Sequence, residues 1–281
     1  LRKWDTCAMT LLSCILITSL IVDAFETNIT QLYWSRDLEV ALNKELFGQH
    51  VASRVVLKTN LMSQLIAESI YHKGMESGFV HLFTATAHFP TPEVLTYLLS
   101  QLQMWVKGNV TKCPTLHVYF DEMDKMQPGL IDSIKPYLDY YDNLDGVSYR
   151  QAIFIFLSNA GGEKIAEVAL NFWNAGQERE EIELKDLEMA ITLSVFNNKQ
   201  SGFWHATLID KHLVDVYVPF LPLEQKHVVQ CGLAEMVARK MKPDKEVVER
   251  MAQDLNYFPK EHRLFATQGC KVISSRLDYY I

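Results

Sequence analysis

The stretch Leu116-His117-Val118-Tyr119-Phe120-Asp121-Glu122 decides the fold, because an apolar run ends there in two adjacent carboxylates. A second apolar run, Ile153-Phe154-Ile155-Phe156-Leu157, comes later in the chain and leads into Ser158-Asn159. Short apolar runs bounded by polar residues are typical of buried strands in a parallel sheet. Because ligands of such sheets gather at the carboxyl ends of the strands, we expect Asp121, Glu122 and Asn159 to share one edge.

The acidic pair fits the hydrolytic half of a nucleotide-hydrolysing site. We expect Asp121 to hold Mg²⁺ through water and Glu122 to polarise the attacking water, which are the roles such groups have in phosphoryl transfer. Asn159 would orient that water or contact the γ-phosphate. A structural interpretation stays open, because an Asp after a strand often caps the next helix and an Asn in a loop often stabilises its own turn.

The phosphate-binding half of such a site is missing from the sequence. It requires the string G-x-x-x-x-G-K-[ST], whose backbone N–H groups surround the phosphates. No such string occurs in the 281 residues. Since neither that lysine nor a nest of N–H groups remains to offset the triphosphate charge, we expect impaired ATP binding.

Strands alternate with helices along the chain, which predicts a doubly wound α/β sheet. We expect strands over residues 79–83, 116–120, 153–157 and 214–220, and helices over residues 51–71, 93–107, 130–141, 163–175 and 185–193. The chain beyond residue 223 is mainly helical. The predicted organisation is a lead-in over 25–50, a large α/β domain over 51–222 and a small helical domain over 223–281.

The first 24 residues have the pattern of a secretory signal peptide. Arg2 and Lys3 precede an uncharged stretch over residues 6–22, and Val22-Asp23-Ala24 offers a cleavage site before Phe25. A segment retained as a membrane hairpin or an interfacial anchor is the alternative.

Several other features agree with a lumenal glycoprotein. Asn28 and Asn109 begin N-glycosylation sequons. Outside the first 24 residues the cysteines are Cys113, Cys231 and Cys270, so at most one disulfide forms among them, and three buried inert thiols are the alternative. The net charge of −7 and the absence of a basic run argue against nucleic-acid binding.

The chain resembles the torsins, a branch of the AAA+ ATPases related to Clp-type unfoldases, and within them the animal torsin-1 group. The resemblance covers roughly residues 38 to 280, and strings as long as these do not recur by chance. It rests on Leu46–His50, Phe120–Met126, Ile131–Tyr141, Asp145–Tyr149, Ile155–Gly161, Val195–Lys199, Ser201–His205, Val218–Glu224, Phe258–Glu261 and Gly269–Lys271.

The resemblance implies an AAA+ fold, ATP and Mg²⁺ as ligands, and a role for each matching residue. Asp121 and Glu122 match the Walker B pair, Asn159 matches sensor 1 and Lys271 matches sensor 2. Cys231 and Cys270 match a cysteine pair that can link the small domain's helix to the sensor-2 loop. Such a bond would couple redox state to nucleotide sensing.

The resemblance also implies a compartment and a partner. Torsins reside in the endoplasmic reticulum lumen and the contiguous nuclear envelope. They lack an arginine finger of their own and depend on a membrane-anchored lumenal activator of the lamina-associated type that supplies it, a contribution worth several orders of magnitude in rate. A homo-oligomer and peripheral association with a membrane are compatible with the same resemblance.

The chain departs from the torsins between Lys58 and Leu65. Torsins carry there a loop, the first strand of the sheet and the phosphate loop, whereas here only Thr59-Asn60 joins two helices. Asn60 stands where torsins have an Asn after the phosphate-binding lysine. Because AAA+ sheets run in the order 5-1-4-3-2, the missing strand is the central one, and its loss exposes the edges of two neighbours. We therefore expect a poorly folded product unless strands 4 and 5 close the gap.

His262 is a second departure, because torsins commonly have a second Glu after the residue that Glu261 matches. Two functions remain in competition. The first is a torsin-like ATPase that remodels proteins of the lumen and nuclear envelope. The second is a non-catalytic, splice-type isoform that acts only as a binding partner or decoy for the activator. An unrelated lumenal glycoprotein with a chance acidic pair is the third possibility.

Overall fold

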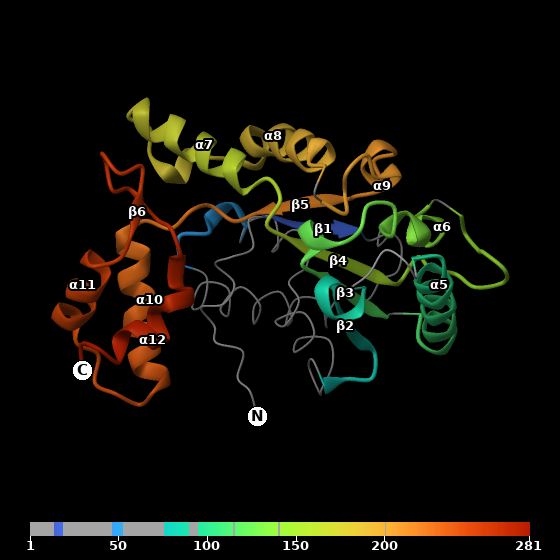
Figure 1. The fold of residues 1–281 in the computed structure, drawn as a ribbon, viewed down its shortest axis with the longest axis horizontal. Coiled ribbons are helices and arrows are strands. Elements are labelled where there is room, and N and C mark those ends of the chain that lie inside the picture. The colour runs from blue at the N-terminus through green and yellow to red at the C-terminus, as the bar shows by residue number, and fades with distance from the viewer. Residues whose placement is uncertain are drawn as a thin grey trace, which may run out of the picture.

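The fold is that of a computed structural model, which describes residues 14–18, 47–52, 76–89, 95–114, 116–139, 141–199 and 201–281 (Figure 1). The elements in chain order are β1 (Cys14–Thr18), β2 (Val80–Thr84), α4 (Ala85–His88), α5 (Leu95–Lys112), β3 (His117–Asp121), η4 (Met123–Lys125), η5 (Ile131–Ile134), α6 (Lys135–Leu138), β4 (Ile153–Ser158), α7 (Gly162–Asn174), η6 (Arg179–Glu181), α8 (Leu184–Asn197), α9 (Thr207–Asp210), β5 (Val216–Pro219), α10 (Gln225–Ala238), α11 (Lys245–Gln253), β6 (Tyr257–Phe258), β7 (Phe265–Ala266), η7 (Gly269–Val272) and α12 (Ile273–Leu277).

Five of these strands form one sheet, in the order β2-β3-β4-β1-β5 (Figure 1). The neighbours β2, β3 and β4 are parallel. β1 runs antiparallel to both β4 and β5, with Leu16 opposite Phe156 on one side and Tyr217 on the other. β4 and β5 therefore run in the same direction, as in an AAA+ sheet, although the strand between them is reversed.

The central position of the sheet, expected to be empty, is filled by β1. The expectation of two exposed strand edges is therefore wrong for the full chain, and the gap is not closed by pairing β4 directly with β5. The sequence Cys-Ile-Leu-Ile-Thr explains the substitution, because a central strand is apolar on both faces and favours β-branched residues. Cleavage of residues 1–24 as a signal peptide stays a prediction, but the structure uses residues 14–18 as a strand.

A row of phenylalanines crosses the parallel part of the sheet. The Phe83, Phe120 and Phe156 rings stack between neighbouring strands with centroids 5.5 and 5.4 Å apart, and Phe203 meets Phe156 edge-on at 6.0 Å. Trp105 of α5 packs edge-on against Phe83 at 4.8 Å. Offset and edge-on pairs of this kind stabilise a core beyond their buried area. The row fixes the lateral position of the strands that end in the acidic pair and in Asn159.

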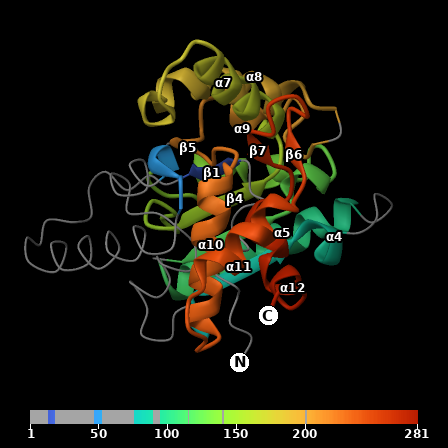
Figure 2. The same cartoon turned by 90° about the vertical axis from the view of Figure 1, so that its left-hand side faces the viewer.

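Helices α7 and α8 pack against each other and cover the β5 side of the sheet (Figure 2). Ile165 of α7 and Leu187, Ile191 and Val195 of α8 are almost fully buried. The helical spacing of these three α8 residues produces the apolar stripe that faces the core. A capping box between Glu183 and Asp186 begins α8.

Two helix predictions need correction. Gly108 does not end the helix predicted over 93–107, because α5 continues to Lys112, and Val110 beyond the glycine is 1% exposed. Burial of that turn outweighs the cost of one glycine in a helix interior, about 1 kcal/mol. The helix predicted over 130–141 is two short pieces, η5 and α6, with Pro136 in the first turn of α6, where a missing N–H costs nothing. Most of the helix predicted over 51–71 lies outside the described residues.

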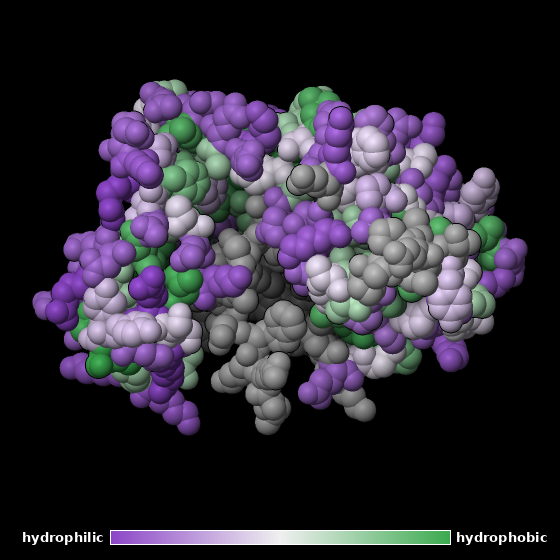
Figure 3. All heavy atoms as spheres, in the orientation of Figure 1, coloured by the Kyte–Doolittle hydropathy of each residue, from purple (hydrophilic) through white to green (hydrophobic). Residues whose placement is uncertain are grey.

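The C-terminal unit has its own core. It begins at Leu223 and collects buried side chains from α10, α11 and α12, among them Val228, Val248, Met251 and Ile273. The short β6–β7 hairpin joins this unit to the α/β core through Phe265. On the face in Figure 3, hydrophilic residues cover much of the surface of both this unit and the α/β unit. Within the described part of the chain, none of the helices combines the length and the apolar composition that a bilayer crossing requires.

Candidate functional site

The carboxyl ends of β3 and β4 bring the predicted catalytic residues to one edge of the sheet. Asp121 is the last residue of β3, Glu122 follows it, and Asn159 follows β4. The Asp124 carboxylate accepts a hydrogen bond of 3.1 Å from the backbone N–H of Asn159, which ties the two strand ends together. The sequence therefore predicted the shared edge correctly, although Asp124 was not among the predicted residues.

Glu122 has an unusual backbone and two donors on its side chain. Its φ of 57° and ψ of 39° lie in the left-handed region, which few residues other than glycine adopt. The Lys125 ammonium donates to one carboxylate oxygen at 2.7 Å, and the Thr86 hydroxyl donates to the other. These hydrogen bonds, Lys125 first, lower the pKa of Glu122. A carboxylate held in this way stays ionised, but both of its oxygens are already engaged.

Asp121 is half-buried, and burial raises the pKa of its carboxyl group. A hydrogen bond of 2.7 Å from the backbone N–H of Glu122 opposes this shift, while the charges of Glu122 and Asp124 add to it. A divalent cation beside the group would lower that pKa again. The carboxylate of Asp121 thus fits a hydrated Mg²⁺, which usually takes one or two carboxylates and completes its shell with water and phosphate. Among the described residues, no cluster of three His, Cys, Asp or Glu side chains is arranged to hold a metal ion by itself.

Lys271 and the cysteine pair lie in the C-terminal unit. Cys231 of α10 and Cys270 of η7 form a disulfide with a Cα–Cα distance of 6.0 Å, so the pairing implied by the resemblance is present in the structure. Both sulfurs belong to buried residues, whereas Lys271, the next residue along, is exposed. The disulfide therefore fixes the backbone from which the Lys271 side chain extends into solvent.

The remaining predicted site residues are only partly described. Asn60 and Asn28 lie outside the described residues. Asn109 lies within α5, where its side-chain amide donates to the Trp105 carbonyl at 2.8 Å. His262, the second departure from the family pattern, packs its ring against the tilted Trp173 ring of α7, with centroids 4.7 Å apart, and so joins the C-terminal hairpin to the α/β unit.

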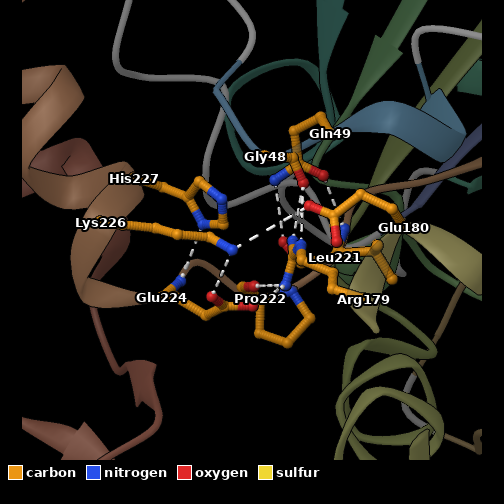
Figure 4. A network of polar contacts seen from close by, with 9 residues as sticks. All are labelled: Gly48, Gln49, Arg179, Glu180, Leu221, Pro222, Glu224, Lys226 and His227. Carbon is orange, nitrogen blue, oxygen red and sulfur yellow. Dashed lines mark hydrogen bonds and ion pairs between the residues drawn. The ribbon is translucent and has the colours of Figure 1, made fainter. Parts of the chain in front are cut away.

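A polar junction that the sequence did not predict connects the lead-in to both units (Figure 4). The Arg179 guanidinium is 8% exposed and donates to the Gly48 carbonyl at 2.7 Å and to the Pro222 carbonyl at 2.6 Å. The Gln49 amide forms two hydrogen bonds with the backbone of Leu221, of 2.8 and 2.7 Å. The string Gly48-Gln49 thus clamps the segment that leads from β5 into α10.

The buried charge of Arg179 at this junction is opposed by the half-buried carboxylate of Glu224. Burial lowers the pKa of Arg179 to about 10, and Glu224, 3.5 Å away, opposes that shift. His227 accepts a hydrogen bond of 3.1 Å from the Glu224 N–H on its Nδ1, which requires a neutral ring. Burial, together with Arg179 and Lys226, lowers the pKa of His227 to about 3.

Gly48 is required at this junction for two reasons. Its φ of +66° is in the left-handed region, and a Cβ there would lie 2.6 Å from the His227 ring. No other residue can therefore take its place without moving α10. The string Leu46–His50 is one of those that resemble the torsins, but no pattern in the sequence identified Arg179 as the partner of Gly48.

Two family models match the chain. The model described as Torsin matches residues 58–120, and this match ends at Phe120, the residue before Asp121. The model described as Torsin-1A, C-terminal domain matches residues 223–280. The first match begins at Lys58, the residue that precedes the junction at Thr59-Asn60. The second match coincides with the unit whose separate core begins at Leu223.

Proposed function

The chain belongs to the torsin family of AAA+ proteins, and from this premise we propose that it is a torsin with impaired ATP binding. In this proposal the hydrolytic carboxylates are retained and the means of holding the triphosphate is lost. The family's activity, ATP-driven remodelling of proteins in the endoplasmic reticulum lumen and nuclear envelope, would then be reduced or absent in this chain.

The direction of β1 is the observation that carries the proposal. In a parallel sheet, the loop after a strand starts at the edge where Asp121 lies. The first residue of β1, Cys14, lies opposite Ser158 at that edge, and the last, Thr18, lies opposite Phe154 at the other. The chain therefore leaves β1 on the side of the sheet away from the acidic pair. Replacing the central strand in reverse restores the sheet without delivering a loop to the phosphates.

The contacts of Glu122 support the same proposal. A base that polarises water needs one carboxylate oxygen directed at that water. Here Lys125 and Thr86 engage both oxygens of Glu122. The Lys125 contact is local, since the two residues are three apart, whereas the Thr86 contact comes from α4, and a bound nucleotide with Mg²⁺ would have to displace both. Nothing in the sequence supplies the phosphate-binding lysine that would hold such a nucleotide in place.

A lumenal location is proposed from the disulfide and the sequons. Disulfides persist in oxidising compartments such as the endoplasmic reticulum lumen, and the buried Cys231–Cys270 bond fits that environment. Asn109 offers a glycan site there, provided that α5 opens locally, because its amide is engaged with Trp105. The partner proposed in this compartment is a membrane-anchored activator of the lamina-associated type.

A non-catalytic role is the second candidate, and one observation favours it. The C-terminal unit is complete, with its own core, its disulfide and its family match, even though the phosphate loop is missing. A chain that keeps this unit and lacks turnover would act as a binding partner or decoy for the activator. Binding of the activator's lumenal domain without ATP hydrolysis would support this candidate.

Nucleotide binding by the full chain tests the proposal. We expect no saturable binding of Mg·ATP in a titration that extends to millimolar concentration, since no group remains to offset the triphosphate charge. Glu122→Gln, which traps ATP when a working base is removed, is expected to change nothing. Micromolar affinity for ATP, or affinity that appears with Glu122→Gln, would contradict the proposal.

A further inference from the structure

We propose that Cys14–Thr18 is an integral strand of this protein, so that the α/β sheet is closed only while the amino-terminal segment is retained. Two observations carry this proposal: β1 pairs on both of its sides, and the slot that it fills lies in the middle of the sheet. The inference concerns folding and does not depend on whether the chain binds nucleotide.

With β1 in place, β4 and β5 lie too far apart to pair with each other. Neighbouring strands lie about 4.7–4.9 Å apart, so β4 and β5 are separated by about two such spacings. Hydrogen bonds between backbone N–H and C=O groups require about 3 Å between nitrogen and oxygen. Without β1, both strands would keep unpaired backbone groups, and every residue of β4 is buried. Buried backbone groups without partners cost about as much as lost hydrogen bonds, which is a strong reason for the slot to be filled.

The register shows how β1 satisfies this slot. Ile15, Leu16 and Ile17 lie opposite Leu157, Phe156 and Ile155 of β4. On the other side the same three residues lie opposite Val218, Tyr217 and Val216 of β5. An apolar strand of five residues therefore meets apolar neighbours at each inner position.

The consequence is a conflict between targeting and folding. The stretch over residues 6–22 predicts a signal peptide cleaved before Phe25, and the strand lies inside that stretch. A chain processed at that position loses β1 and exposes the facing edges of β4 and β5, which are templates for aggregation. A chain that keeps the segment closes its sheet. Residues 14–18 would thus belong both to a cleaved targeting segment and to the folded sheet, and one chain cannot do both.

Cross-linking in the full chain tests the strand directly. Cys14 lies opposite Ser158, and residues in opposite register have Cα atoms about 4.5–5.5 Å apart, within the range of a disulfide. The chain would be produced without membranes in a Cys7→Ser, Cys113→Ser background, with a protease site inserted after residue 30. In the Ser158→Cys variant, mild oxidation followed by cleavage should leave fragment 1–30 attached on a denaturing, non-reducing gel. Reducing agent should release it.

Leu157→Cys is the matched control, because adjacent residues of a strand point to opposite faces of the sheet. In this variant the fragment should separate with or without oxidation. Separation of the fragment in Ser158→Cys, or equal attachment in both variants, would overturn the proposed register.

A second measurement keeps the proposal testable if Ser158→Cys does not fold. The chain with the inserted site and native residues 14–18 is cleaved and run on gel filtration under native conditions. Fragment 1–30 should co-elute with the remainder, Leu16→Pro should release it by removing one ladder N–H, and Leu16→Val should retain it. If the native fragment elutes alone and the remainder keeps its Tm, the strand is dispensable and the proposal is wrong.

Discussion

The two units of this protein close their cores by different means. The C-terminal unit is built from segments that follow one another, α10, α11, the β6–β7 hairpin, η7 and α12, and a disulfide joins its first helix to η7. The α/β unit instead uses residues 14–18 from the start of the chain between strands that lie far along it. Local contacts form quickly and survive the loss of distant segments, whereas non-local pairing depends on the whole chain.

The comparison separates two requirements that a nucleotide-binding sheet normally meets together. A β-ladder accepts a strand in either direction, so the hydrogen bonds of β4 and β5 are satisfied by a reversed β1. A phosphate site needs the chain to leave the central strand at one particular edge. The reversed strand satisfies the hydrogen bonds of its neighbours, but the chain leaves it at the edge opposite the acidic pair. A closed core is therefore no sign that the site beside it is complete.

The largest effect is expected in the α/β core. Phe156→Ala should destabilise this unit by about 3–5 kcal/mol, because the side chain is fully buried and stacks on Phe120. Met251→Ala, at a fully buried position of the C-terminal core, is the matched variant. Urea unfolding followed by circular dichroism and by limited proteolysis of each unit should show that each variant weakens mainly its own unit. An equal loss of stability in both units would mean that they unfold together and that their cores are not independent.

Reduction of the disulfide should weaken only the C-terminal unit. The bond closes a loop with a sequence separation of 39, and the chain-entropy relation for such a loop gives about 4 kcal/mol. Cys231→Ser with Cys270→Ser should therefore lower the Tm of this unit, and proteolytic cleavage between residues 223 and 281 should increase. The control is the native chain under reducing agent, which should behave in the same way. If cleavage instead appears first in β4 or β5, the disulfide supports the α/β unit as well.

Acidification should weaken the chain through two buried histidines. The pKa of His227 is lowered to about 3 and that of His117 to about 4, mainly by burial. Below the ordinary pKa of 6.5, the unfolded state therefore binds more protons than the folded state. The free energy of unfolding decreases as the pH is lowered from 6.5. Each histidine contributes at most about 1.4 kcal/mol per pH unit.

The two histidines lie in different regions, so the loss of stability on acidification can be assigned to each region separately. His117 lies in β3, whereas His227 lies at the junction between the units. His227→Asn, whose amide oxygen can accept the same N–H, should flatten the slope of stability between pH 6.5 and 5, as measured by urea unfolding. His117→Gln should flatten it further. An unchanged slope in both variants would place the acid sensitivity elsewhere, in carboxylates whose pKa is lowered in the folded protein, such as Glu122.

The smallest effect is expected at the acidic pair. Lys125→Met removes the larger of the two hydrogen bonds that lower the pKa of Glu122, so that pKa should rise. Stability should change by no more than about 1 kcal/mol, because the pair is exposed to solvent. Lys164→Met, which removes a similar ion pair with Glu167, should leave Glu122 unaffected. A Glu122 pKa that does not move in a carboxyl NMR titration would mean that Lys125 does not engage it in solution.

The parallel strands were predictable because their sequences have only one physical use. Runs such as residues 116–120 and 153–157 are too apolar for the surface and too short for a membrane, and the polar residues that follow mark the site edge. Residues 14–18 were not predictable in the same way. An apolar run near the start of a chain serves equally well as a signal peptide or as a buried strand, and its own residues do not reveal the position beside β4 that it takes in the full chain.

The contacts within the site were less predictable than its location. Asp121, Glu122 and Asn159 follow from where strands end, which is a property of single segments. The engagement of Glu122 by Thr86, and of Gly48 by Arg179, joins segments far apart in the chain. No periodicity or local motif encodes such pairs, because they depend on how β2 lies beside β3 and how η6 approaches the lead-in.

Hydrogen–deuterium exchange of the full chain, with and without Mg·ATP, tests the central claim most directly. Backbone amides in a central strand exchange only through extensive unfolding, whereas those of an undocked segment exchange at once. The account predicts slow exchange for peptides covering residues 14–18, and no change at residues 116–126 when Mg·ATP is added. Rapid exchange at residues 14–18, or protection of residues 116–126 by Mg·ATP, would contradict it.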